Sequence, residues 1–192
     1  MSGARARRVQ RGGLLIEVLV AVFVCAFALL GFVAMQARAV TAEFEALQRS
    51  QALVLVEDMA TRISANRARA ADYVQAGLVG AGALAACGGL AGAALDLCEW
   101  SNLIRGSTEE RGGSRIGAML GARGCITRAV GGSDRYVVSV AWSGVVPTGA
   151  PPSPCGRGDA AFGDAALRRA VASTVCVGRL RDPAVAVVQS RC

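Results

Sequence analysis

The sequence has no histidine and no lysine among its 192 residues, so all 21 basic side chains are arginine. Without histidine, the chain cannot form a Ser-His-Asp triad, a Cys-His pair or a histidine-ligated metal site. It also lacks a C-x-x-C motif, a P-loop and a strand-linked G-x-G-x-x-G, which argues against redox catalysis and nucleotide binding. No nucleophile can be placed beside a base, and no two carboxylates can be placed together. We therefore expect a protein that is not an enzyme and that requires no cofactor and no metal.

The positive charge is concentrated at the start of the chain. The formal net charge is +7, and four arginines stand in the first eleven residues with no acidic residue among them. They are Arg5, Arg7, Arg8 and Arg11. The remaining 17 arginines face 14 acidic residues, which leaves about +3 for the rest of the chain. A basic tail beside an apolar helix sets membrane orientation, so no nucleic-acid partner is expected.

An apolar run of 22 residues follows the basic tail, at positions 14–35. It contains one charge, Glu17, and no proline. As a helix it measures about 33 Å, enough to cross a hydrocarbon core of about 30 Å. Because secretory signals have shorter apolar cores, we expect this segment to be retained as a single membrane span. The arginines before it predict a cytoplasmic N-terminus and an outward-facing C-terminus.

Glu17 is the unusual residue of this run. A carboxylate in hydrocarbon costs at least about 2.5 kcal/mol. One interpretation is that Glu17 lies near the cytoplasmic interface and stays hydrated. The other is that the glutamate has a function inside the membrane.

The sequence around Glu17, RGGLLIEVLV at residues 11–20, resembles the cleavage site of type IV prepilins. The resemblance implies that prepilin peptidase cuts between Gly12 and Gly13 and methylates the new amine of Gly13. Glu17 is then the fifth mature residue. The match departs from most members, which have Phe at the position of Gly13 and Thr or Ser at that of Leu14. A cut after Gly13 would instead make Glu17 the fourth mature residue.

In this family the glutamate has an assembly role. In a staggered helical bundle, the amine of one subunit can meet the Glu17 carboxylate of its neighbour. Pairing the two charges offsets part of their desolvation and fixes the register, because a slipped register leaves both unpaired. The resemblance therefore implies that Glu17 directs polymerisation.

The helical pattern continues past the apolar run without proline or glycine from residue 32 to 75. We expect a basic leader at 1–12, a transmembrane and polymerisation helix at 13–36, its amphipathic continuation at 37–70, and a periplasmic head at 71–192. A membrane anchor followed by a separate domain helix would give the same periodicity.

The head reads as a loop and then a sheet. An Ala/Gly-rich stretch at 76–97 predicts a loop with one short helical piece, and residues 116–120 predict a turn of helix. Segments 125–130 and 136–142, then 171–180 and 184–189, predict two hairpins. The fold class is therefore α+β, with a long N-terminal helix packed on an antiparallel sheet of about four strands. Trp100 and Trp142 are expected in the core or at an interface. Arg168 and Arg169 could touch an anionic partner, but we expect them on a solvated helix face.

Four further segments narrow the resemblance to the PilV-type minor pilins, also called type IV pilus modification proteins. They are LQRSQA at 47–52, MATRISANR at 59–67, YVVSVAW at 136–142 and ALRRAVASTV at 166–175. The resemblance implies an inner-membrane protein that primes or caps a pilus. Its partners would be other minor pilins, the major pilin, prepilin peptidase, the inner-membrane assembly platform and the lipid bilayer.

Six of the seven cysteines lie outside the apolar run, at Cys87, Cys98, Cys125, Cys155, Cys176 and Cys192. On the oxidising side of the membrane, six cysteines allow up to three disulfides in 15 connectivities. Cys87 with Cys98 is the local pair that we favour. Cys25 lies in the apolar run, where a thiol packs like an apolar side chain.

Two other functions fit the same sequence. A pseudopilin of a type II secretion system would have the same N-terminus. A membrane-tethered adhesin or DNA-uptake module would bind through its variable loops. Neighbouring subunits, identified by crosslinking, distinguish the first from a pilus subunit.

Overall fold

The computed structural model describes residues 13–106, 110–111, 114–115, 119–130 and 134–178. The chain divides into two compact units, Met1–Phe44 and Glu45–Cys192. The helix α1, Gly13–Ala65, contributes to both units. Each unit is described by itself below.

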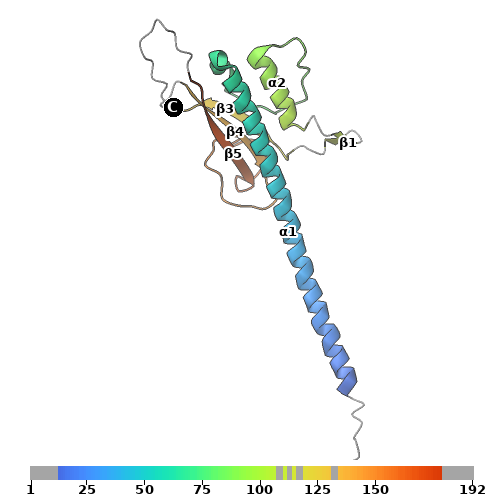
Figure 1. Cartoon of the computed structure of the whole chain (residues 1–192). Helices are drawn as coiled ribbons and strands as arrows, with labels where there is room; N and C mark the ends of the chain where they lie inside the picture. The colour runs from blue at the N-terminus through green and yellow to red at the C-terminus, as the bar shows by residue number, and fades with distance from the viewer. Residues whose placement is uncertain (1–12, 107–109, 112–113, 116–118, 131–133, 179–192) are drawn as a thin grey trace, which may run out of the picture. The chain divides into compact units, whose positions relative to one another are not determined.

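The described part of the first unit consists of α1 up to Phe44 (Figure 1). Its apolar side chains are exposed from Leu14 to Met35, and no residue of its most apolar 18-residue window, of mean hydropathy 2.9, is buried. Among the described residues, α1 is the one helix that is long and apolar enough to cross a membrane.

The α1 helix ends at Ala65 rather than at residue 70. Asn66 leaves the helical region, with φ −103° and ψ 44°, and the chain continues as the 3₁₀-helix η1, Arg67–Tyr73. Asparagine favours helix ends because its side chain competes for nearby backbone groups. The chain after Asn66 therefore forms a 3₁₀-helix, where the periodicity predicted that the α-helix would continue.

The second unit is built on one antiparallel sheet of three strands in the order β3–β4–β5. The strands are β3, Arg123–Arg128, β4, Arg135–Ser143, and β5, Arg168–Cys176. The central strand β4 pairs with both neighbours, so that Val138 faces Ile126 on one side and Ser173 on the other. The predicted first hairpin is therefore present. Of the second predicted hairpin, residues 184–189 lie outside the described residues.

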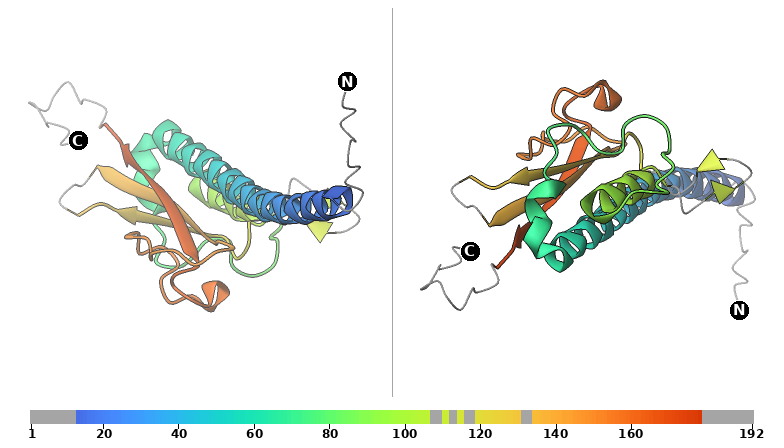
Figure 2. Two further views of the ribbon diagram at one scale, coloured as in Figure 1. Left: turned by 90° about the horizontal axis from the view of Figure 1, so that it is seen from below. Right: turned by 90° about the horizontal axis from the view of Figure 1, so that it is seen from above.

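The main core lies between the sheet and the second part of α1. Successive turns of that helix bury Gln48, Ala52, Val56, Met59 and Ile63, which follow a helical spacing of three or four. Alternate residues of β4 face them, including Val138, Val140 and Trp142. Figure 2 shows the sheet beside this part of α1.

A second helix, α2, Gly92–Ile104, also packs on the sheet. Its buried residues are Ala93, Trp100 and Ile104. The Ala/Gly-rich stretch before it is largely loop, as expected, but the helix is longer than the short piece predicted. Apolar side chains recur at helical spacing only after residue 92. The alanines and glycines before that position favour a loop and hide the start of the helix.

The remaining elements are short. Strands β1, Glu110–Arg111, and β2, Ser114–Arg115, form a two-stranded ladder. The 3₁₀-helix η2, Ala160–Phe162, places Phe162 against Ala141 and Cys155 in a smaller core. Of the helical turn predicted at 116–120, residues 116–118 lie outside the described residues and Leu120 lies in a turn.

The expected helix face at Arg168 and Arg169 was wrong. Both residues lie in β5, and their side chains leave opposite faces of the sheet because successive strand residues alternate. The arginine pair in sequence resembled a solvated face. In the fold, each arginine instead has its own set of partners.

Candidate functional site

The exposed N-terminal part of α1 is the candidate assembly site. Leu15, Leu19 and Phe23 are at least 60% exposed, as are many of their neighbours. Such a large exposed apolar surface is unusual for a soluble domain and marks a membrane or protein contact. The helix therefore has the length and surface expected of a membrane anchor.

Glu17 is the single charged residue of this apolar surface, one turn after the start of α1 at Gly13. Its side chain is exposed and has no hydrogen bond or ion pair within the described part of the chain. The carboxylate is thus free for a partner outside the subunit. Gly12, the residue expected before the cleavage point, lies outside the described residues.

In the second unit, Glu45 joins α1 to the segment that follows β4. Its Oε1 accepts hydrogen bonds from the backbone N–H groups of Val145 and Val146, at 3.2 and 3.3 Å. The same oxygen accepts from Nη2 of Arg169 on β5, at 3.1 Å. One carboxylate therefore fixes a helix, a strand and a loop together.

Arg62 performs a similar task near the end of α1. Its guanidinium pairs with Asp58 on the same helix, and with Asp96 and Glu99 on α2, at 3.0, 3.0 and 2.7 Å. Hydrogen bonding by these carboxylates, Glu99 first, raises the pKa of Arg62. Four charges in one cluster thus hold α2 against α1.

The phenol of Tyr73 extends this cluster. Its hydroxyl donates a short hydrogen bond to Asp96 and accepts one from Asn66 at 3.2 Å. Burial, followed by the bond to Asp96, raises the pKa of Tyr73. The Tyr73 hydroxyl therefore remains a protonated donor in the neutral range.

Two disulfides are complete within the described residues. Cys87 and Cys98, the local pair favoured from the sequence, are joined at 2.03 Å and tie the Ala/Gly-rich loop to α2. Cys125 on β3 is joined to Cys155 in the loop after β4, also at 2.03 Å.

The other three cysteines differ in state. Cys176 also takes part in a disulfide. Cys25 on the apolar part of α1 is a free thiol. Cys192 lies outside the described residues.

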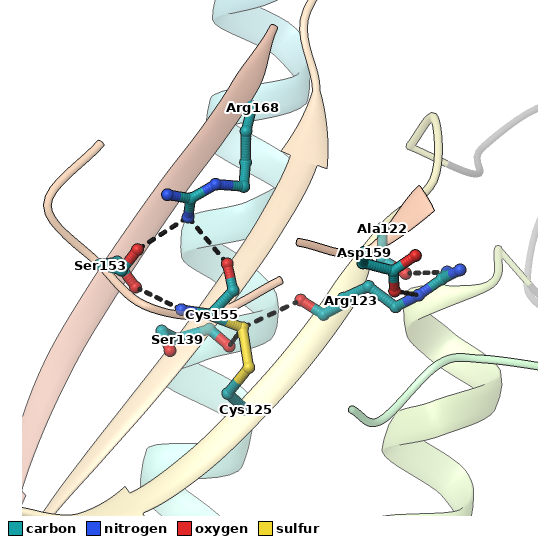
Figure 3. Close-up of a disulfide and its surroundings, with 8 residues drawn as sticks. All are labelled: Ala122, Arg123, Cys125, Ser139, Ser153, Cys155, Asp159 and Arg168. Atoms are coloured by element: carbon teal, nitrogen blue, oxygen red, sulfur yellow. Dashed lines mark hydrogen bonds and ion pairs between the residues drawn. A yellow bond between two sulfur atoms is a disulfide. The ribbon is translucent and has the colours of Figure 1, made fainter. Parts of the chain in front are cut away.

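The Cys125–Cys155 disulfide lies over the face of the sheet opposite α1, next to Arg168 (Figure 3). Nη1 of Arg168 donates to the carbonyls of Ser153 and Cys155, at 2.7 and 2.8 Å. Nη2 donates to the carbonyl of Pro151, at 3.1 Å. Burial, and then the charge of Arg157, lower the pKa of Arg168. A disulfide and an arginine together fasten this loop to the sheet.

Asp159 fastens the same segment further along. Its carboxylate accepts from the backbone N–H of Ala161 and pairs with Nε of Arg123, both at 2.8 Å. The hydrogen bond from Ala161, followed by the hydrogen bond and the positive charge of Arg123, lowers the pKa of Asp159. Sequence reasoning had not singled out Glu45, Arg62 or Asp159. Only the fold brings them to their partners, which are 34 to 124 residues away in three of these contacts.

The described residues contain no group of three or more His, Cys, Asp or Glu side chains that could hold a metal ion. The acidic residues around Arg62 are already paired with a cation. These ion pairs join α1 to α2 within the head.

Comparison with known proteins gives one family match. Residues 34–87 match the family model described as Tt1218-like, type IV pilin Tt1218. The match covers the second part of α1, η1 and the loop up to Cys87, which is under a third of the chain. No curated protein and no solved structure shows a match.

The matched residues begin at residue 34, at the end of the exposed apolar segment that carries Glu17. The long apolar helix and antiparallel sheet form the α+β architecture expected from the sequence. The chain is therefore similar to type IV pilins over residues 34–87, and its described residues have a long apolar helix and an antiparallel sheet.

Proposed function

We propose that this protein is a minor pilin-like subunit of the PilV type that takes part in type IV pilus assembly, in a priming or tip complex. The observation that carries the proposal is Glu17, an exposed carboxylate with no partner in the described residues, within an exposed apolar helix. A charge in that position is costly unless another subunit supplies the opposite charge.

The processing that creates this opposite charge is part of the proposal. Prepilin peptidase removes the leader at 1–12, and Gly13 becomes a methylated N-terminal amine. The chain then crosses the inner membrane once, with the head on the periplasmic side, where its disulfides form. Its partners are other minor pilins, the major pilin and the assembly platform.

Processing is tested by N-terminal sequencing and mass spectrometry of the mature protein. A first residue of Gly13 carrying a methyl group is the expected result. A chain that starts at Met1, or after the apolar run, would contradict the proposal. A mature protein that begins at Leu14 would show that the peptidase cuts between Gly13 and Leu14.

The role of Glu17 is tested by Glu17→Ala. The variant should insert into the membrane normally, because it loses only a costly charge. Its amount in sheared filaments, relative to the membrane fraction, should fall at least about tenfold, as expected for loss of a charge pair in a low-dielectric core. Glu43→Ala is the matched control, because Glu43 is also exposed on α1 and has no partner among the described residues. Normal incorporation of the Glu17 variant would exclude this role.

Crosslinking in the membrane identifies the neighbours. Recovery with pilus subunits supports the proposal, whereas recovery with secretion pseudopilins would assign the chain to a type II secretion system. A chain that crosslinks to neither but retains a ligand through its loops would be a tethered adhesin or DNA-uptake module.

A further inference from the structure

The charged residues in the first unit are few and follow a pattern. Its described part, the α1 helix up to the unit boundary, carries three charged side chains, at Glu17, Arg38 and Glu43. Cleavage before Gly13, as proposed above, adds the charge of a new amine. The order along the helix is then positive, negative, positive, negative, with uncharged residues between the two pairs.

Arg38 and Glu43 are both available to a partner outside the subunit. Their side chains are exposed on α1 beyond the apolar run, and neither has a hydrogen bond or an ion pair among the described residues. They stand five residues apart, whereas side chains that pair on one helix stand three or four apart. Neither residue is therefore placed to neutralise the other within the same chain.

The spacing of this second pair matches that of the first. Glu17 follows Gly13 by four residues, and Glu43 follows Arg38 by five. At about 1.5 Å per residue, these offsets are about 6 and 7.5 Å along the helix axis. A parallel copy that is displaced until its amine is level with Glu17 of its neighbour therefore brings its Arg38 to within about 1.5 Å of the level of the neighbour's Glu43.

The helix faces agree with this displacement. At about 3.6 residues per turn, Arg38 leaves the helix within about 20° of the side of Gly13. Glu43 leaves it about 80° from the side of Glu17, and the two rotations have opposite signs. Because the two helices face each other, these opposite rotations bring Arg38 and Glu43 to the same flank of the contact. Charged side chains in such flanking positions pair across parallel helices.

We propose that two copies of this chain pack their α1 helices in parallel, one displaced by about four residues, and that Arg38 of one copy pairs with Glu43 of the other. The displacement rests on the proposed pairing of Glu17 with the amine, and the second pair adds another point of register. Without the displacement, Arg38 would be level with Arg38 and Glu43 with Glu43, so like charges would repel.

The second pair is weaker than the first because it lies beyond the apolar run, where water screens it. Glu43→Ala removes only this exposed attraction. Its effect on incorporation into filaments should therefore be far smaller than the tenfold loss expected for Glu17→Ala. Charge reversal, which replaces an attraction with a repulsion, is the sharper test.

The displacement is measured by cysteine crosslinking of the full chain in bacterial membranes. In the proposed register, Gly31 of one copy is level with Met35 of the other, on the contact side of both helices. Met35 is exposed, and a Cβ atom at Gly31 meets no atom within 4 Å. Gly31→Cys and Met35→Cys are introduced into two differently tagged chains, both carrying Cys25→Ser because Cys25 is a free thiol. Mild oxidation should link the two chains, and each chain paired with its own kind should crosslink at least about fivefold less.

Arg38→Glu in the Gly31→Cys chain should lower the crosslinking yield by about fivefold, since an exposed attraction becomes a repulsion. Adding Glu43→Arg to the Met35→Cys chain should restore the yield. The matched control is the same Arg38→Glu in the Met35→Cys chain, which should have no effect because Arg38 of that copy does not face its neighbour. Equal losses from both placements would overturn the proposal. A loss without rescue would also overturn it and indicate a lipid phosphate as the partner of Arg38.

Glu17→Ala in the Met35→Cys chain separates this pair from the proposed function. A loss of crosslinking with Glu17→Ala, together with an unchanged yield with Arg38→Glu, would keep the assembly role of Glu17 and reject the second pair. An unchanged yield with Glu17→Ala would reject the role of Glu17, whatever Arg38→Glu does. If the two reporter chains do not crosslink at all, two copies of this chain are not neighbours, and the proposal is wrong.

Discussion

Glu45 shows how much one side chain can hold. Its carboxylate accepts from two backbone N–H groups and from Arg169, which lies 124 residues away in the sequence. Loss of this carboxylate would cost free energy of folding, because the partly buried donors that it accepts from would be left without an acceptor. The sequence could not identify this residue, because Glu43 and Glu45 look alike on a helix of unknown surroundings.

We predict that Glu45→Gln lowers the free energy of unfolding by about 1–3 kcal/mol. The neutral amide keeps an oxygen that accepts hydrogen bonds, but it cannot form an ion pair with Arg169. Thermal unfolding followed by circular dichroism measures the change. Glu43→Gln should be neutral, since Glu43 is exposed and has no partner among the described residues. Equal effects of the two substitutions would show that the Glu45 contacts contribute no stability.

Asp159 predicts a pH dependence. Its pKa is held below the ordinary value of 3.8, so folding is favoured when the carboxylate is ionised. This contribution is complete well above pH 3.8, and it is lost as the pH falls through the lowered native pKa. Asp159→Asn should therefore be less stable than the wild type at pH 7, by about 1 kcal/mol.

The difference in melting temperature between the Asp159→Asn variant and the wild type should narrow as the pH falls from 7 to about 2. A difference that stays constant over this range would show that the charge of Asp159 is not what stabilises the loop.

At the scale of elements, strong periodicity made α1, β3 and β4 predictable. The helix lacks proline and glycine between residues 32 and 75, and the two strands flank a turn sequence. The α2 helix was underestimated because alanine and glycine dominate the residues before it. Strand β5 begins three residues earlier than expected, because Arg168 and Arg169 find partners on both faces of the sheet.

The packing of α2 on β3 depends on Gly124. A Cβ atom there would lie 2.4 Å from the ring of Trp100 and 2.7 Å from Ile104. We predict that Gly124→Ala destabilises the head by about 1–3 kcal/mol through overpacking. In Gly77→Ala, the added methyl group meets no atom within 4 Å. The free energy of unfolding of Gly77→Ala, measured by chemical denaturation, should therefore lie within about 0.5 kcal/mol of the wild-type value. A stable Gly124→Ala protein would mean that α2 can shift on the sheet.

At the scale of the molecule, the boundary between the two compact units falls inside α1, between Phe44 and Glu45. The sequence analysis divides the helical stretch at residue 36, where the apolar run ends, and expects the head to begin at residue 71. The head needs the helix beyond Glu45 because Val56, Met59 and Ile63 belong to its core. For the candidate assembly site, the sequence indicated the motif around Glu17. The function of Glu17 stays a prediction.

This division predicts the outcome of two truncations. A chain that begins at Glu45 keeps the whole described core and should be soluble, with cooperative thermal unfolding. A chain that begins at Arg67 loses the α1 part of the core and should not unfold cooperatively. Both are produced in an oxidising compartment and compared by circular dichroism. A cooperative transition in the shorter chain would show that the sheet and α2 suffice.

The disulfide between Cys125 and Cys155 encloses the connection from β3 to β4. A protease that cuts after Arg128, which is exposed at the end of β3, would break the chain inside this covalent ring. The two fragments would stay joined through sulfur and would migrate as one species until a reductant is added. Nicking at this hairpin is therefore invisible on a non-reducing gel and becomes apparent only after reduction.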